Sequence, residues 1–407
     1  MAGLAIIGGG PAGLMAAEAA RAASPGLDIH VFEAKPSLGR KFLMAGKSGL
    51  NITHAGDLPS FLARYGRDEK VLRGFIEAFP PAKIISWMEA LGSKAVIGSS
   101  GLIFPKQWKA SPLLRRWLAR LDEGGVQFRT RHIWRGWDEA GALLFDTPEG
   151  VRPFAADAVI FALGGASWPR LGSDGQWADG LAARGIAIAP FAASNVGVRV
   201  SWSDIFKSRF AGEPIKNVIF SCKGRVSRGE AVVTEQGLEG GGIYALSAAL
   251  RHALVKGSAQ IRVNFLPDWP EAKILAHLQK PRGKESFGNF LRKRFGLSGA
   301  KAALLREAFL LRGENFPPPA EADFFTALTA CPIVIEGFTP MERAISTVGG
   351  VQFSALDENL MLKALPDHYC VGEMVDWDAP TGGYLLSACF AMGRWAGTAA
   401  ARRLLVD

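Results

Sequence analysis

The chain has 407 residues, of which 48% are hydrophobic, and its formal net charge is +9. This length accommodates two or three domains with substantial hydrophobic cores. No apolar run reaches the ~18 residues of a membrane-spanning helix, and the four scattered cysteines form no CxxC pair. These properties argue against a membrane partner, a zinc ribbon or a dithiol redox centre, and they predict a cytoplasmic protein of unspecified oligomeric state.

A strand, a helix and a second strand are predicted at the start of the chain. Residues 4–9 are apolar without alternation, which is typical of a strand buried on both faces of a parallel sheet. Residues 11–23 predict an Ala-rich helix that Ser24-Pro25-Gly26 ends, and residues 27–34 predict the second strand.

The turn between the first strand and the helix has the sequence GGGPAG, which places Gly8, Gly10 and Gly13 in a GxGxxG frame. Glycines here permit a tight turn and let a pyrophosphate approach the N–H groups of the helix N-terminus. Glu33 ends the second strand, where a carboxylate accepts hydrogen bonds from ribose hydroxyls. The combination predicts a dinucleotide site rather than a glycine-rich turn without a ligand.

The rest of the chain predicts an α/β domain built from both chain ends around an insertion. Amphipathic stretches lie within residues 57–123, turn-linked strands within 125–150, and another buried strand within 156–166 ends on two glycines. We predict a dinucleotide-binding domain whose first part is 1–194 and whose return is 331–407, a β-rich domain over 195–269, and a basic helical domain over 270–330.

Most of the excess positive charge lies in the middle of the chain. Residues 195–344 contain 21 Lys or Arg against 14 Asp or Glu, and residues 279–312 contain nine against two. Such a segment fits either a solvated surface or a partner with phosphates, such as RNA. Phe287, Phe290 and Phe295 fall at helical spacing, which favours a hydrophobic core over base stacking.

The choice between NAD and FAD depends on both ends of the chain. Arg40 and Lys41 follow the acidic strand end and can contact pyrophosphate or ribose through charge-assisted hydrogen bonds. In the C-terminal block, Gly372-Glu373 ends a strand and Gly382-Gly383-Tyr384 begins a helix. A helix N-terminus stabilises negative charge on a reduced flavin ring by about 0.3–2 kcal/mol. An extended FAD needs both ends of such a domain, so we expect FAD.

Five blocks in this order resemble the bacterial flavoproteins of the BaiN/YhiN type, NAD(P)/FAD-dependent oxidoreductases distantly similar to fumarate reductase flavoprotein subunits. The blocks are GGGPAGLMAAE, GRKFLMAGKSGLNITH, VIFALGGASWPRLGSDGQWADGLAARG, TEQGLEGGGIYALS, and STVGGV followed by CVGEMVDWDAPTGGYLLSACFAMG. The resemblance covers nearly the whole chain. It implies a Rossmann-like FAD-binding domain with an inserted β-barrel-like domain and a small helical domain.

The resemblance also implies which residues contact FAD. The matching positions are Gly8, Gly10, Pro11, Ala12, Gly13, Glu33, Arg40, Lys41, Asn51, Ile133, Gly164, Gly165, Gly372, Glu373, Asp376, Gly382, Gly383 and Tyr384. Ile133 is the expected backbone contact to adenine. The family commonly has SGGGRCNFTN where this chain has AGKSGLNITH; Asn51 and Thr53 remain, but Gly49-Leu50 replace an Arg-Cys pair. The chain therefore resembles a divergent subgroup.

The loop of residues 39–54 supplies the candidate catalytic residues. We predict that Lys47, Asn51 and His54 lie near the reacting edge of the flavin. His54 is a candidate proton donor because imidazole titrates near neutral pH, and the alternative is an exposed loop histidine. Lys47 either polarises a substrate carbonyl or is surface charge. Trp168 and Tyr384 either contact the flavin or serve only in packing.

The predicted activity is hydride transfer through flavin N5. The resemblance implies reduction of a conjugated C=C bond, in a small molecule or in RNA uridine. No second GxGxxG motif occurs, so NAD(P)H is expected only as a transient reductant. The alternatives are a flavin oxidase of amines or amino-ketones and a flavin-binding protein without turnover. No metal is predicted.

Overall fold

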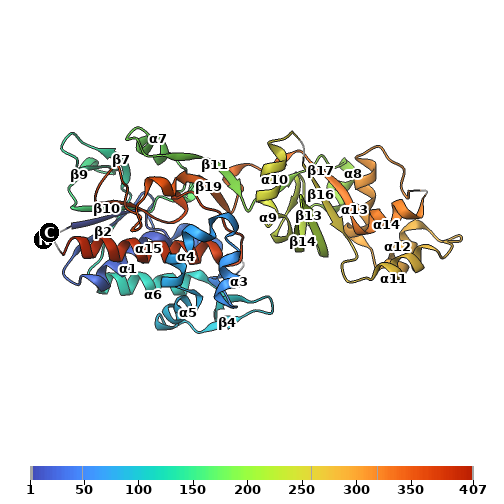
Figure 1. The fold of residues 1–407 in the computed structure, drawn as a ribbon, viewed down its shortest axis with the longest axis horizontal. Helices are drawn as coiled ribbons and strands as arrows, with labels where there is room; N and C mark the ends of the chain where they lie inside the picture. The colour runs from blue at the N-terminus through green and yellow to red at the C-terminus, as the bar shows by residue number, and fades with distance from the viewer. Residues whose placement is uncertain (1–2, 48, 258, 319, 406–407) are drawn as a thin grey trace. The chain divides into compact units, whose positions relative to one another are not determined.

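The computed structural model describes residues 3–47, 49–257, 259–318 and 320–405, which form two compact units (Figure 1). Unit 1 comprises Met1–Ala192 and Ser346–Asp407, and unit 2 comprises Ala193–Ile345. The chain leaves unit 1 through strand β11 and re-enters it at strand β19. Unit 2 is therefore an insertion in a domain that both chain ends build.

Unit 1 contains a parallel sheet of five strands in the order β20-β10-β1-β2-β6. Their bounds are Gly3–Ile7 (β1), Asp28–Glu33 (β2), Gln127–Thr130 (β6), Ala158–Phe161 (β10) and His368–Cys370 (β20). In the central register, Ile6 pairs with Val31 on one side and Ile160 on the other. All three are fully buried, which confirms the predicted α/β fold with a parallel sheet.

Helices and three small sheets complete unit 1. The helices are α1 (Pro11–Ala23), α2 (Arg40–Ala45), α3 (Leu58–Ala63), α4 (Glu69–Ala78), α5 (Pro81–Ala90), α6 (Ala110–Glu123), α7 (Trp177–Ala182) and α15 (Tyr384–Arg403). The small sheets join β3 (Thr53–His54), β5 (Leu102–Pro105) and β4 (Ala95–Ile97); β7 (Ile133–Trp137), β8 (Leu143–Thr147) and β9 (Gly150–Phe154); and β11 (Ile188–Ser194) with β19 (Ser346–Val351).

The first and last long helices of unit 1 lie side by side, as Figure 1 shows for α1 and α15. Two glycines of α15 make this approach possible. A Cβ atom added at Gly393 would lie 2.2 Å from the carbonyl oxygen of Ala12, and one added at Gly397 would lie 2.3 Å from that of Ala16. The close contact joins the C-terminal block to the first dinucleotide turn.

Unit 2 contains a sheet of seven strands in the order β17-β16-β13-β14-β15-β12-β18. The strands are β12 (Val198–Arg199), β13 (Pro214–Cys222), β14 (Arg225–Thr234), β15 (Gly237–Glu239), β16 (Ala259–Asn264), β17 (Cys331–Ile335) and β18 (Gly337–Phe338). The helices are α8 (Asp204–Phe210), α9 (Gly241–Tyr244), α10 (Ser247–Leu254), α11 (Glu271–Leu278), α12 (Phe287–Phe295), α13 (Gly299–Leu310) and α14 (Glu321–Thr329).

The structure differs from the predicted domain bounds in two places. Strand β17 does not return to unit 1: it pairs with β16 in antiparallel register, because its alternating buried residues complete the sheet of unit 2. The segment 270–330 is not a separate domain either, since its apolar side chains share one hydrophobic core with that sheet. The return to unit 1 lies at Ser346 instead of residue 331.

The contact between α1 and α15 is sensitive to one methyl group. We expect Gly397→Ala to lower the free energy of unfolding by about 1–3 kcal/mol, because the added Cβ overlaps the Ala16 carbonyl. The matched control is Gly180→Ala in α7, where an added Cβ meets no atom within 4 Å. Denaturant unfolding of the two variants measures the difference, and equal stability of Gly397→Ala and the wild type would contradict this packing.

Candidate active site

Four loops of unit 1 lie together at one edge of the parallel sheet. Strands β1, β2, β10 and β20 run in the same direction, so their carboxyl ends share that edge. Four predicted cofactor contacts follow or end these strands: Gly8 after β1, Glu33 at the end of β2, Gly164 after β10 and Gly372 after β20. In open α/β sheets this edge is where ligands bind.

The turn between β1 and α1 has the geometry expected for binding a pyrophosphate. Gly8 has φ +113°, and a Cβ there would lie 2.2 Å from the carbonyl oxygen of Ala162, so the residue must be glycine. At Gly10 an added Cβ meets no atom within 4 Å, which leaves room beside the backbone. Pro11 begins the helix, so its missing N–H costs no helical hydrogen bond.

Glu33 is held against the same turn. Its Oε2 accepts a hydrogen bond from Gly9 N at 3.1 Å, and its Oε1 accepts one from Lys35 N at 2.8 Å. Burial raises the pKa of Glu33, although these two N–H donors oppose the shift. Each carboxylate oxygen keeps a second lone pair, which is available for a ribose hydroxyl.

An ion pair connects the two ends of the chain beside this edge. Lys41 Nζ lies 2.6 Å from Glu373 Oε2, and the side chains are only 25% and 15% exposed. Lys41 also donates to Ser167 Oγ at 3.2 Å and Ser173 Oγ at 3.4 Å. Glu373 Oε1 accepts from Thr347 N at 3.0 Å. In the structure Lys41 holds Glu373 in place, and its contact with pyrophosphate or ribose stays a prediction.

The loop after α2 carries a buried polar atom without a protein partner. Asn51 Oδ1 is enclosed and accepts no hydrogen bond from the described residues. The backbone around it is fixed, since Leu50 N donates to Trp108 O at 2.8 Å and Ile52 N to Ile103 O at 2.9 Å. An enclosed amide oxygen without a donor marks a place for a ligand group. Lys47, in contrast, is exposed.

His54 and Tyr384 meet at the end of this loop. Their rings stack with centroids 5.6 Å apart. His54 Nε2 lies 3.1 Å from Ser100 O, and Nδ1 contacts Ala55 O, so both ring nitrogens already face backbone carbonyls. The predicted proton donor is thus a packed, hydrogen-bonded side chain rather than a free loop histidine.

Helix α15 begins against strand β3. Gly383 has φ +90°, and a Cβ there would lie 2.5 Å from Thr53 Cα, so only glycine fits. Thr53 Oγ1 and Ser387 Oγ share a hydrogen bond of 2.9 Å, and Tyr65 Oη donates to Tyr384 O at 2.8 Å. The first turn of the helix is therefore fixed, with its N–H groups presented beside the loop of Asn51.

The other predicted contacts are distributed around the same edge. Arg40 begins α2 and donates to Ser37 Oγ at 3.2 Å, while its enclosed Nε has no partner in the part of the chain that the structure describes. Gly165 leaves no room for a Cβ, which would lie 2.0 Å from Thr347 Oγ1. Asp376 Oδ1 accepts from Gly349 N at 3.0 Å. Trp168 has φ +61° in the loop after β10.

Ile133, the predicted adenine contact, follows a residue that is hydrogen-bonded to the end of β2. It begins β7 in a separate sheet, pairs with Asp146 and is 42% exposed. The neighbouring His132 makes the contact with the parallel sheet, since its N donates to Glu33 O at 3.0 Å. The adenine contact of Ile133 stays a prediction.

These residues fit FAD. The open space at Gly10, the tethered carboxylate of Glu33 and the enclosed, unpaired atoms of Arg40 and Asn51 provide donors and acceptors along one edge of the sheet. The N-terminus of α15 lies at one end of that set. The pyrophosphate is expected at the turn of α1, the ribose at Glu33 and the flavin ring near Asn51.

Three hydroxyl residues of the site were not predicted individually: Ser167, Ser173 and Thr347. Thr347 Oγ1 accepts from Ala166 N at 3.1 Å, and Ser173 Oγ donates to Gly165 O at 2.8 Å. All three lie in sequence blocks that carry the family resemblance. Their position in those blocks was the available signal, but only tertiary contacts identify them as partners of Lys41 and Glu373.

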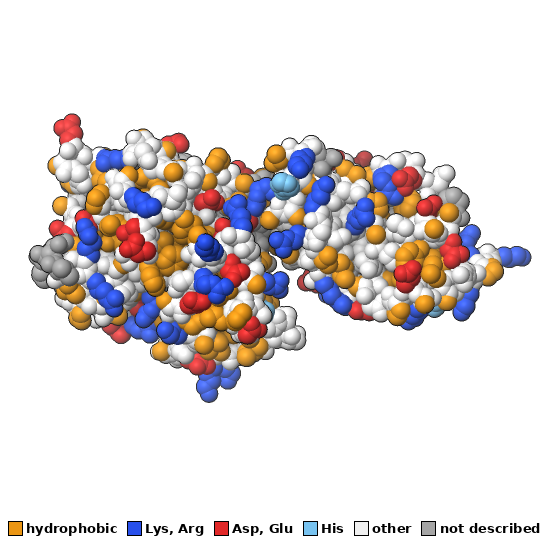
Figure 2. Space-filling model, in the orientation of Figure 1, with side chains coloured by type: hydrophobic (Ala, Val, Ile, Leu, Met, Phe, Trp, Pro, Cys, Tyr) orange, Lys and Arg blue, Asp and Glu red, His pale blue; other side chains and the backbone are white. Residues whose placement is uncertain are grey.

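The cations of the basic helical segment are largely engaged within unit 2. Arg294 donates to the carbonyl oxygens of Lys280 and Pro281, and Lys293 pairs with Glu285 at 3.0 Å. Figure 2 shows the lysines and arginines of unit 2 dispersed on this face rather than gathered in one patch. The three phenylalanines belong to the core or pack against it, as their helical spacing predicted.

Solved structures with a similar fold are flavoenzymes. The open conformation of a flavocytochrome c3 fumarate reductase aligns with 99% of this chain and 78% of its own, at 15% identity and a TM-score of 0.54. The 3-ketosteroid-Δ4-(5α)-dehydrogenase of Rhodococcus jostii RHA1, in complex with 4-androstene-3,17-dione, aligns with 98% of this chain and 97% of its own, at 15% identity and a TM-score of 0.53. The fold is that of the FAD-dependent oxidoreductases, as predicted.

The chain belongs to the HI0933-like protein Rossmann-domain family, whose model matches residues 2–399. It is 26% identical over 413 aligned residues to the 3-dehydro-bile acid Δ(4,6)-reductase of Clostridium scindens, covering 98% of this chain and 99% of the relative. The predicted family and the predicted class, an FAD-dependent oxidoreductase, are therefore confirmed. Among the described residues, no helix is long and apolar enough to cross a membrane, and no three His, Cys, Asp or Glu residues form a metal site.

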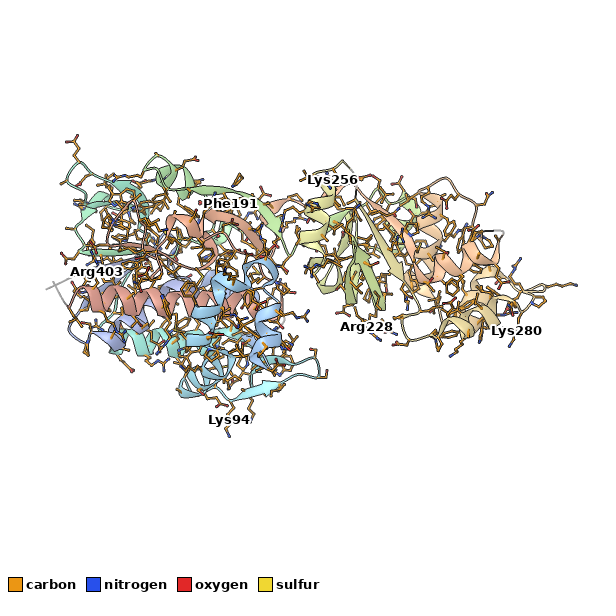
Figure 3. The ribbon with its side chains drawn as sticks, in the orientation of Figure 1. Lys94, Phe191, Arg228, Lys256, Lys280 and Arg403 are labelled. Carbon is orange, nitrogen blue, oxygen red and sulfur yellow. The ribbon has the colours of Figure 1, made fainter. Side chains whose placement is uncertain are left out.

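We expect the ion pair of Lys41 to retain the cofactor. Lys41→Met keeps the length of the side chain but leaves the partly buried Glu373 without its cation. The free energy of unfolding should fall by about 1–3 kcal/mol, and the variant should lose FAD during gel filtration. Lys94→Met is the matched control, because Lys94 points away from unit 1 (Figure 3). Wild-type flavin content in Lys41→Met would contradict the role of the pair.

The four cysteines should be unreactive in the folded protein. Burial raises the pKa of Cys331 and of Cys389 to about 12, and it also raises the pKa of Cys222 and Cys370. Since the thiolate is the reactive form, a pKa near 12 leaves about one thiolate in 10⁴ molecules at pH 8. Titration with Ellman's reagent should therefore be slow until the protein is unfolded. Rapid reaction of one thiol in the native state would be the contrary result.

Proposed function

We propose that this protein is an FAD-dependent reductase that adds hydrogen across a C=C bond conjugated to a ketone in a steroid-like substrate. The observation that carries the proposal is the end-to-end similarity to a reductase whose name specifies a Δ(4,6) bile acid substrate. The chemistry balances as a hydride delivered to the β-carbon and a proton delivered to the α-carbon of the enone.

Reduced FAD supplies the hydride in such a reaction, and the protein places the reactants. Lys41 holds Glu373, which fixes the loop after β20 against the segment after β2 and the loop after β10. Asn51 presents its enclosed amide at the loop where the flavin ring is expected. The N–H groups of the first turn of α15 favour negative charge next to them.

We propose His54 as the residue that supplies the proton. Its ring is held by Tyr384 and by the carbonyl oxygen of Ser100. Donation to substrate through Nε2 requires that this nitrogen exchange the 3.1 Å contact with Ser100 O for one with the substrate. Lys47 remains the proposed partner of the substrate ketone, because its exposed side chain has the reach of a flexible cation.

NAD(P)H is the proposed reductant, bound transiently because the sequence has no second GxGxxG motif. A reductase of RNA uridine remains a second substrate class for the same chemistry. No observation on the described residues favours it, and two cations of the basic segment, Lys293 and Arg294, already have partners within unit 2. The oxidase of amines or amino-ketones likewise has no supporting observation.

The first experiment is an anaerobic titration of the purified, FAD-loaded protein with NADPH and NADH, followed by 4-androstene-3,17-dione as a model enone. The flavin absorbance should bleach with one of the nucleotides and recover when the steroid is added, and the steroid should gain two hydrogen atoms by mass spectrometry. His54→Gln should slow the recovery at least ~10-fold, in the range of general acid catalysis, without changing the bleaching.

Three outcomes would contradict the proposal in different ways. A flavin that neither nucleotide reduces would favour a protein electron donor or a non-catalytic role. Bleaching of the oxidised flavin by an amine or amino-ketone without any nucleotide, followed by recovery with oxygen and formation of peroxide, would favour an oxidase. Recovery with rRNA fragments but with no steroid enone would favour the RNA substrate.

A further inference from the structure

Trp108 is an exposed aromatic residue beside the candidate active site. It lies between β5 and α6 and is 46% exposed. Its ring stacks on Phe104, with centroids 4.2 Å apart and planes inclined by 22°. Phe104 itself is buried. One face of the indole is therefore supported by the protein, while the rest of the side chain is available to a ligand.

The backbone holds Trp108 in an uncommon conformation. Its φ is +59°, in the left-handed region that a bulky side chain rarely adopts. Two hydrogen bonds maintain this conformation: Trp108 N donates to Pro105 O at 2.7 Å, and Trp108 O accepts from Leu50 N at 2.8 Å. Strain of this kind persists where the surrounding structure fixes it, often at ligand-binding sites.

Trp108 is connected directly to the loop of the unpaired amide. A Cβ added at Gly49 would lie 3.1 Å from Trp108 Cε3 and 3.6 Å from Phe104 Cε1. Gly49 lies two residues before Asn51, whose Oδ1 has no donor among the described residues. Strand β5 continues the same wall: Leu102 pairs with His54, and its Cδ2 lies 3.6 Å from the Cβ position of Gly382.

We infer that Trp108 is a substrate-binding residue that determines specificity for flat, polycyclic enones. This inference rests on the proposed function, because it assigns the apolar rings of the same substrate to Trp108. The enone must reach the reacting edge near Asn51, and the remaining fused rings of a steroid extend well beyond that edge. The indole of Trp108 is exposed, stacks on Phe104 and lies next to the loop that contains Asn51. It therefore offers these rings a flat apolar surface.

The alternative explanation is that Trp108 only shields the hydrophobic core. Phe104 is buried and stacks on Trp108, so the indole does cover part of the core. The left-handed backbone and the remaining exposure distinguish Trp108 from a side chain selected for packing alone. A substrate with one ring would not reach the indole, so its binding should be independent of this residue.

The test compares a four-ring enone with a single-ring enone on FAD-loaded protein. Dissociation constants for 4-androstene-3,17-dione and 2-cyclohexenone are measured by isothermal titration with wild type, Trp108→Ala, Trp108→Phe and Ile97→Ala. Ile97 is the matched control, because it is 63% exposed on β4 of the same small sheet but outside the stack. Flavin content and melting temperature are recorded for each variant.

For Trp108→Ala we expect the steroid dissociation constant to rise about tenfold, as the loss of one apolar contact face predicts. The value for 2-cyclohexenone should stay within about twofold. Trp108→Phe should retain most of the steroid affinity, and Ile97→Ala should behave as wild type. Trp108→Phe retains an aromatic ring that packs on Phe104. The comparison can therefore be made with this variant if Trp108→Ala is poorly folded.

The possible failures are distinguishable. If the wild type reduces the steroid and Trp108→Ala binds it with unchanged affinity, the inference is wrong and the proposed function stands. If the wild type binds the steroid through Trp108 without reducing it, the inference stands and the proposed function is wrong. An equal loss of affinity for both enones would make Trp108 a general structural residue, and no steroid binding by the wild type would overturn both.

Discussion

The contact between the first and last helices is the constraint on which the rest of the site depends. Helix α15 approaches α1 so closely that Gly393 and Gly397 face carbonyl oxygens of α1 where any larger residue would have a Cβ. This contact fixes the start of α15, and with it Tyr384, relative to the dinucleotide turn. Parts of the site that are more than 350 residues apart in the chain therefore form one edge of one sheet.

The Lys41–Glu373 ion pair also joins the N-terminal and C-terminal parts of unit 1, through a polar contact. Each partner is only partly exposed, and each has further hydrogen bonds, so the pair is a positioned network rather than a surface salt bridge. It connects the loop after β2 with the loop after β20. The groups proposed to hold FAD thereby keep their relative positions before any ligand binds, which limits the entropy lost on binding.

In the proposed reaction the cofactor and the protein have separate roles. The flavin provides the redox reaction, while unit 1 provides an anion-binding turn, a ribose acceptor, an unpaired amide and a helix N-terminus along one edge. His54 and Trp108 lie at opposite ends of the β3–β5 pairing that borders this edge, since His54 pairs with Leu102 and Trp108 O accepts from Leu50 N. The first would contribute a proton, and the second would select the shape of the substrate.

The sequence alone determined those parts of the site whose residues lie close together in the chain. The strand, the glycine turn, helix α1 and Glu33 follow one another within about thirty residues, so their spacing predicts the dinucleotide site. The resemblance added the C-terminal block and the insertion. Local pattern also predicted that Phe287, Phe290 and Phe295 pack with the core, because helical spacing reports which face is buried.

Only the tertiary structure decided which distant groups are partners. Lys41 follows an acidic strand end, which predicts a contact with the cofactor, and the structure pairs it with Glu373, 332 residues away. Strand β17 has a composition that suits either unit, and pairing with β16 determines that it belongs to unit 2. The stacking of Trp108 on Phe104 next to Gly49 likewise cannot be predicted from the sequence. Such contacts depend on how separate elements pack, and no local periodicity encodes that.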